Sequence, residues 1–123
     1  MSRHDPVVRL KHMRDAVLDA TKMVVDRDRQ DLDSDDMLAA ALKYQMMIIG
    51  EAASQLPQSV MDRSPDTPWR DIIGMRHVIV HGYDVVDLDV VWRAATRDLP
   101  LLLTQLGPLI ATLEADGDNV HRS

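Results

Sequence analysis

One segment constrains the fold of this chain more than any other. Residues 37–56, MLAAALKYQMMIIGEAASQL, carry apolar side chains on nearly every side of a helical projection. A helix that is apolar all round is buried by several neighbours, so we expect this segment to be the central helix of the domain. Gly50 within it costs roughly 1 kcal/mol of helix stability relative to alanine. Its presence therefore predicts a close approach by another backbone at that point.

The segments on either side predict further helices. Apolar residues recur there at three- and four-residue spacing, which is the pattern of a helix with one buried face. The first series is Leu10, Met13, Val17, Ala20 and Val24, and the last is Leu99, Leu102, Leu103, Leu106, Ile110 and Leu113. We expect a bend at Pro100, and a kink or local irregularity at Pro108, because proline removes a helical hydrogen bond.

Capping residues predict where the other helices begin and end. Asp33 or Ser34 is a natural N-cap for the central helix. Thr67 followed by Pro68 is typical of an N-cap and a first helical residue, which predicts a helix over WRDIIGMRHVIVH. Gly82 directly follows that segment and is expected to end the helix.

The composition favours helices throughout. Aromatic residues make up 3% of the 123 residues and phenylalanine is absent, so leucine, alanine and methionine have to fill the core. A short helical stretch is expected at 58–62, and Asp87 is expected to cap a fourth helix. We predict an all-α, antiparallel bundle of four to five helices over residues 1–114, followed by a flexible C-terminal tail at 115–123.

Charge and residue content exclude several functions. The chain has no cysteine, which excludes disulfide scaffolds, cysteine-ligated metals and cysteine nucleophiles. Its net charge of −6 argues against general nucleic-acid coating, although residues 26–36 alone contribute −4. That acidic segment lacks the glycine and glutamate positions of an EF-hand loop. With no signal peptide and no apolar run of about 20 residues, we expect a cytoplasmic protein that does not bind membranes.

Chemistry-bearing residues gather at the end of the predicted helix over 69–81. Arg76 is a planar cation that can hold a phosphate, and His81 is a proton carrier near neutral pH. On an ideal helix these two positions are about 140° apart, so they converge only if the last turn unwinds. Two other interpretations remain open. His77 and His81 have the i, i+4 spacing of a zinc site, or Arg76 forms a surface ion pair and His81 has a capping or core role.

The motif Arg76-x4-His81-x-Tyr83, within GMRHVIVHGYDVVD, resembles the RX4HXY signature of the HepT-like family. That family is the toxin half of HepT/MNT toxin–antitoxin modules and lies within the HEPN superfamily of helical ribonucleases. The segments IIGEAASQLP, PW and DLDVVWRAATRDLPLLL extend the similarity over residues 8–113. The resemblance implies a HEPN-like bundle that forms a homodimer with the motif at the interface.

The resemblance also implies an activity, which is metal-independent RNA cleavage by attack of a 2′-hydroxyl on the adjacent phosphate, with no cofactor. Arg76 would bind the phosphate and stabilise the transition state, and His81 would act as acid or base. His77, where the family commonly has asparagine, would contact RNA or support these residues. A dimer would supply two copies of each group. With so few aromatic residues, we expect selection of the RNA, a tRNA or an mRNA, by shape and phosphate contacts rather than by stacking.

Two further residues carry predictions. The resemblance implies that Tyr83 accepts AMP from an MNT-type nucleotidyltransferase antitoxin, which silences the toxin; the alternative is a packing tyrosine. Glu51 stands in the apolar central segment and needs a partner if it is ionised, for which Arg76 or a histidine is a candidate. The alternative function is a non-catalytic HEPN binding module that acts through protein partners.

Overall fold

The computed structural model describes residues 5–81 and 87–122, and all regular structure in these two ranges is helical. This result confirms the all-α prediction. In chain order the elements are α1 (Pro6–Met23), α2 (Asp31–Ser34), α3 (Asp36–Ser54), α4 (Gln58–Met61), α5 (Trp69–His81), α6 (Leu88–Arg93), the π-helical turn η1 (Ala94–Asp98) and α7 (Leu99–Arg122).

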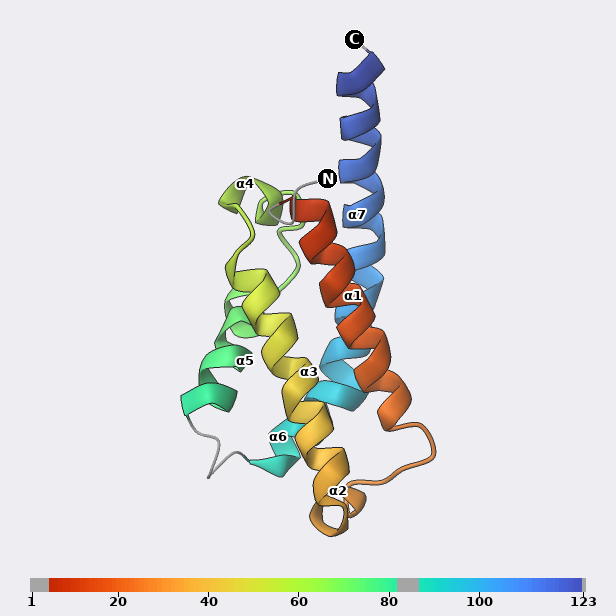
Figure 1. The fold of residues 1–123 in the computed structure, drawn as a ribbon, viewed down its shortest axis with the longest axis vertical. Coiled ribbons are helices and arrows are strands. Elements are labelled where there is room, and N and C mark those ends of the chain that lie inside the picture. The colour runs from red at the N-terminus through yellow and green to blue at the C-terminus, as the bar shows by residue number, and fades with distance from the viewer. Residues whose placement is uncertain (1–4, 82–86, 123) are drawn as a thin grey trace.

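The long helices form an antiparallel bundle with α3 in its middle (Figure 1). Helix α3 packs against α1 on one side and α5 on the other, and α1 also packs against α7. The chain runs in opposite directions along α1 and α3, and again along α3 and α5 (Figure 1). The C-terminal turns of α7 extend beyond the rest of the bundle.

Helix α3 is central, as predicted, but one of its faces is open to solvent. Its buried residues include Leu42, Met46 and Ile49, which belong to the core that the whole bundle shares. On the open face the side chains of Met37 and Tyr44 are 84% and 56% exposed. The apolar segment therefore packs against α1 and α5 while one of its faces stays exposed.

The cap of α3 differs from the prediction. Asp33 and Ser34 belong to the short helix α2, and the N-cap is Asp35, whose carboxylate accepts a hydrogen bond from the Leu38 backbone N–H at 3.0 Å. The extended backbone of Asp35 separates the two helices. The sequence DLDSDD offers several capping side chains in a row, so it does not say which of them stops a helix.

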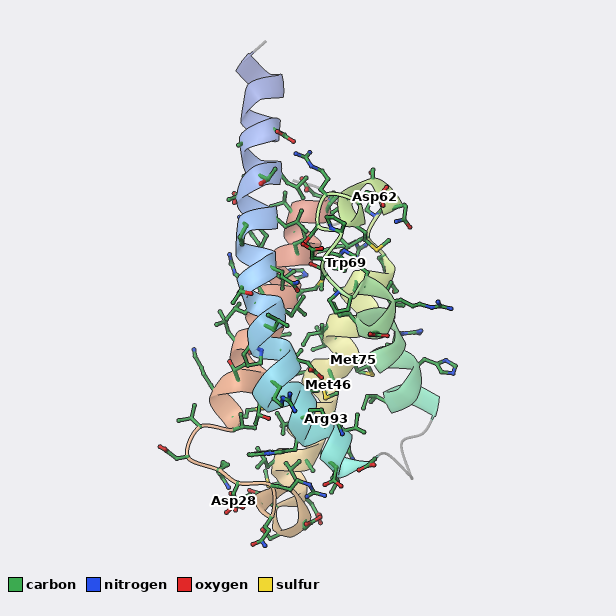
Figure 2. All side chains as sticks on the ribbon, turned by 180° about the vertical axis from the view of Figure 1, so that it is seen from behind. Asp28, Met46, Asp62, Trp69, Met75 and Arg93 are labelled. Atoms are coloured by element: carbon green, nitrogen blue, oxygen red, sulfur yellow. The ribbon has the colours of Figure 1, made fainter. Side chains whose placement is uncertain are left out.

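Helix α5 spans the predicted range Trp69–His81, although its first helical residue is Trp69 rather than Pro68. The hydroxyl of Thr67 is buried and lies 2.6 Å from the hydroxyl of Ser64, with which it shares a hydrogen bond. Trp69 lies just below α4 in Figure 2, and its indole N–H donates to the carbonyls of Met61 and Ser64, each at 3.1 Å. The loop before α5 is thus held by the tryptophan. The predicted helix end at Gly82 lies outside the described residues.

The C-terminal third is helical without interruption from Leu88 to Arg122. Asp87 caps α6 as predicted, since its carboxylate accepts from the backbone N–H of Asp89 at 2.8 Å. The π-helical turn η1 lies just before Pro100, and such a wider turn accommodates a ring that lacks an N–H. Pro108 does not interrupt α7.

Helix α7 continues into the segment that was predicted to be a flexible tail. The tail expected at 115–123 is helical up to Arg122, so the domain boundary at residue 114 does not coincide with a helix end. Its flexibility stays a prediction. Among the described residues, no helix has both the length and the hydropathy that a membrane span requires.

Candidate functional site

The close approach predicted at Gly50 brings Arg76 to the central helix. A Cβ atom added to Gly50 would lie 2.7 Å from the Arg76 backbone nitrogen and 3.0 Å from the Ile72 carbonyl oxygen. Atoms at such distances overlap, so only glycine permits this contact between α3 and α5. The glycine therefore places the α5 backbone at Arg76 directly against α3.

Arg76 forms an ion pair with Glu51, the residue next to that glycine. The contact joins Arg76 Nε to Glu51 Oε2, and the second carboxylate oxygen accepts a hydrogen bond from Gln55 Nε2 at 2.9 Å. Arg76 was one of the partners that the sequence predicts for Glu51. The hydrogen bond from Gln55 to Glu51 was not predicted. Each carboxylate oxygen of Glu51 therefore has a donor, Arg76 for one and Gln55 for the other. These two contacts orient the carboxylate that binds the guanidinium.

The ion pair is partly open to water. The Arg76 and Glu51 side chains are 44% and 45% exposed. Exposed pairs of this kind contribute about 0–1 kcal/mol to stability, so the pair orients Arg76 more than it stabilises the fold. Glu51 contacts the guanidinium at Nε, and the terminal nitrogens of an arginine are the donors that hold a phosphate in a bidentate way.

A groove of about 430 Å³ surrounds this ion pair. It is lined by Arg9 and His12 of α1, by Tyr44, Met47, Ile48, Glu51 and Ala52 of α3, and by Arg76 of α5. Sequence reasoning missed the α1 residues and Tyr44. The spacing of Tyr44, Ile48 and Glu51 places them on one face of a helix and could have indicated Tyr44. The α1 residues carry no such signal in the sequence.

The remaining motif residues lie toward the C-terminal end of α5. His77 is exposed on this helix, and His81 is its last residue. The helix does not unwind before His81, so positions 76 and 81 remain about 140° apart around its axis. The side chain of His81 and the whole of Tyr83 lie outside the described residues. The roles of Arg76, His77, His81, Tyr83 and Glu51 therefore stay predictions.

The described residues contain no group of three or more histidine, aspartate or glutamate side chains close enough to hold a metal ion. The side chain of His81 is not among them, so a site formed by His77 and His81 stays an untested alternative.

A second cavity, of about 370 Å³, lies elsewhere on α5. Its lining includes Met46 of α3, Met75 of α5 and Val91 of α6, and the two methionines are labelled in Figure 2. This lining is mainly apolar and includes none of the predicted site residues. The groove around Arg76 is therefore the candidate functional site.

The fold and the motif together define a class of protein. An antiparallel helical bundle that carries Arg-x4-His-x-Tyr at the end of a core helix has the features expected of a HEPN-type domain. Residues 13–108 match the family model described as "Ribonuclease HepT-like". The chain belongs to this HepT-like ribonuclease family.

Curated relatives carry ribonuclease names. The chain is 25% identical over 100 residues to "Putative RNase MJ1380" of Methanocaldococcus jannaschii, an alignment that covers 81% of this chain and 92% of that protein. It is 30% identical over 81 residues to "Putative RNase TTE0752" of Caldanaerobacter subterraneus, covering 66% and 72%. It is 38% identical over 55 residues to "Probable ribonuclease HepT" of Thermococcus cleftensis, covering 45% and 50%. No solved structure matches the chain.

Proposed function

We propose that this protein is the toxin of a HepT/MNT-type toxin–antitoxin system, a cytoplasmic, metal-independent endoribonuclease. The observation that carries the proposal is the guanidinium of Arg76, which Glu51 holds at its Nε inside an open groove. A cation fixed in this way is suited to bind a phosphate of RNA and to stabilise the charge that develops during cleavage. Membership of the HepT-like ribonuclease family supports the same activity.

Cleavage requires two proton transfers besides the cation. A base removes the proton of the 2′-hydroxyl, whose oxygen attacks the adjacent phosphorus and forms a 2′,3′-cyclic phosphate. An acid then protonates the 5′-oxygen that leaves. In our proposal His81 performs both transfers, one copy as base and the other as acid, in a homodimer that also contributes two copies of Arg76.

The regular geometry of α5 supports the need for a second copy. Within one chain, positions 76 and 81 face directions about 140° apart, because the helix stays regular to its last residue. In the proposed dimer, Arg76 of one protomer and His81 of its partner would meet at one phosphate. His77, exposed on the same helix, would contact the RNA or support these residues.

The decisive experiment is RNA cleavage with matched variants. Purified protein is incubated with tRNA or total RNA, with and without EDTA, beside Arg76→Ala, His81→Ala and the control Arg70→Ala, which removes an exposed arginine from the same helix. We expect cleavage that survives EDTA, is lost by about 100-fold or more in the first two variants, and persists in the control.

Other outcomes would contradict the proposal. A wild-type protein that is folded and dimeric but cleaves no RNA would favour the non-catalytic binding module. Cleavage that disappears with EDTA and returns with a divalent metal would favour a metal site at His77 and His81. Circular dichroism of each variant separates loss of activity from loss of folding.

The antitoxin arm of the proposal has its own test. Co-expression with an MNT-type nucleotidyltransferase should add AMP to Tyr83 and abolish cleavage. Intact-mass spectrometry should detect the added AMP on the wild type but not on Tyr83→Phe. An equal mass increase on both proteins would assign the modification to another residue.

A further inference from the structure

The aromatic side chains of this protein have different environments. Trp69 is 8% exposed and donates two hydrogen bonds to the loop before α5, and Trp92 is partly buried against the core. Tyr44 is 56% exposed, and it lines the groove that contains Arg76. Among the described aromatic residues, Tyr44 therefore presents its ring to solvent, and it does so beside the candidate site.

The position of Tyr44 along α3 fits a nucleotide. Tyr44, Ile48 and Glu51 follow one another at i, i+4 and i+7 on a single helix face and line the same groove. Seven residues of helix span about 10 Å. The tyrosine ring and the Glu51–Arg76 ion pair thus lie at separate points along the groove, far enough apart for a base at one and a phosphate at the other.

The rest of the lining suits the same ligand. Met47 and Ile48 are apolar side chains between the ring and the ion pair, and Arg9 and His12 of α1 add cationic and titratable groups to another wall. A flat base next to a negatively charged backbone complements such a surface, because a base stacks on an aromatic ring while cations contact phosphates. A groove for a peptide or a lipid would not need this pairing.

We propose that Tyr44 is a substrate-binding residue whose ring stacks on the base of a nucleotide next to the phosphate held by Arg76. This inference rests on the proposed ribonuclease function and adds a substrate class, which is RNA with an unpaired base at the cleavage site. Bases within an A-form duplex are stacked on each other and cannot reach a side-chain ring. The proposal also revises the expectation that stacking has no part in RNA selection.

Binding of a non-cleavable RNA tests the stacking directly. A short single-stranded 2′-O-methyl RNA and its abasic counterpart are titrated into wild type, Tyr44→Phe, Tyr44→Leu and the control Met37→Ala, which changes another exposed apolar residue of α3. Tyr44→Leu should weaken binding of the base-containing RNA by about 5- to 150-fold, the usual contribution of one stacked base. Tyr44→Phe and Met37→Ala should bind like wild type, and all four proteins should bind the abasic RNA equally.

Cleavage kinetics provide a second readout. With a single-stranded substrate, Tyr44→Leu should raise KM while kcat stays close to that of wild type, because the ring binds RNA without touching the reacting atoms. Duplex RNA should be cleaved poorly by every protein. The native mass of the variants should equal that of wild type.

Several results would overturn the inference. Equal affinity of Tyr44→Leu and wild type for the base-containing RNA would exclude stacking, as would an equal loss with the abasic RNA. A change in native mass would assign Tyr44 to a protein interface instead. If RNA cleavage depends on Arg76 but Tyr44→Leu binds RNA like wild type, only this inference fails. A wild-type protein that neither binds nor cleaves RNA refutes the proposed function.

Discussion

Replacing Gly50 by alanine should separate α3 from α5 at the candidate site. The new Cβ would lie 2.7 Å from the backbone nitrogen and 2.8 Å from the Cβ of Arg76. Ordinary contacts between such atoms begin at about 3.5 Å, so the backbones have to move apart by up to about 0.8 Å. Backbone atoms cannot rotate away, and overpacking of this kind costs about 1–3 kcal/mol.

The higher helix propensity of alanine opposes this cost, and a matched variant removes that effect. Gly74→Ala makes the same change within α5, where the added Cβ would meet no atom within 4 Å. Each substitution gains roughly 1 kcal/mol of helix propensity. The difference between the two variants therefore isolates the overpacking. We expect Gly50→Ala to be less stable than Gly74→Ala by about 1–3 kcal/mol.

Chemical and thermal denaturation measure this difference. A difference of 1 kcal/mol corresponds to roughly 3–5 °C in Tm for a domain of this size. Because Arg76 moves with α5, Gly50→Ala should also lower kcat/KM for RNA by up to about 100-fold, while Gly74→Ala should retain activity. Equal free energies of unfolding for the two variants would refute the reasoning. They would mean that α3 and α5 accommodate the added methyl group with no loss of stability.

Three further predictions concern the ion pair, the loop and the core. Glu51→Gln should change the free energy of unfolding by less than about 1 kcal/mol, because the ion pair is half-exposed. It should lower RNA cleavage by roughly tenfold, because Arg76 is no longer held in position. Unchanged cleavage would contradict the orienting role of Glu51. Trp69→Phe should cost about 0.5–1.5 kcal/mol in urea denaturation, because the indole hydrogen bonds to the Met61 and Ser64 carbonyls are lost while each carbonyl keeps a backbone donor. Leu106→Ala, at a fully buried position, should lower the free energy of unfolding by about 2–5 kcal/mol. Leu101→Ala, at a position 59% exposed, should change it by no more than about 0.5 kcal/mol. Similar losses in both variants would mean that burial does not determine the loss of stability.

The helices of this fold were predictable because their signals are local. Apolar spacing identified α1, α3 and α7, and the capping aspartate of α6 was correct. The errors occurred where several residues compete for one role. In the run from Asp31 to Asp36, five of the six side chains are good caps, and packing of Leu32 in the core favours a short helix there.

The candidate site was predictable in part. Glycine at position 50 indicated a close helix contact, and a lone glutamate beside it in an apolar segment required a partner. Both signals are local departures from an otherwise apolar pattern. The identity of that partner, Arg76, came from a different helix and depended on how α3 and α5 cross.

By itself, the sequence determined the helical class, the buried faces, the glycine contact and the Arg76–His81–Tyr83 motif that resembles the HepT-like family. Tertiary structure decided which side chains share a groove with Arg76, and it added Tyr44 of α3 and residues of α1. The physical reason is that helical periodicity defines which face of a helix is buried but not which neighbour covers it. That choice depends on the packing of side chains between helices, which here leaves Tyr44 exposed in the groove that also contains Arg76.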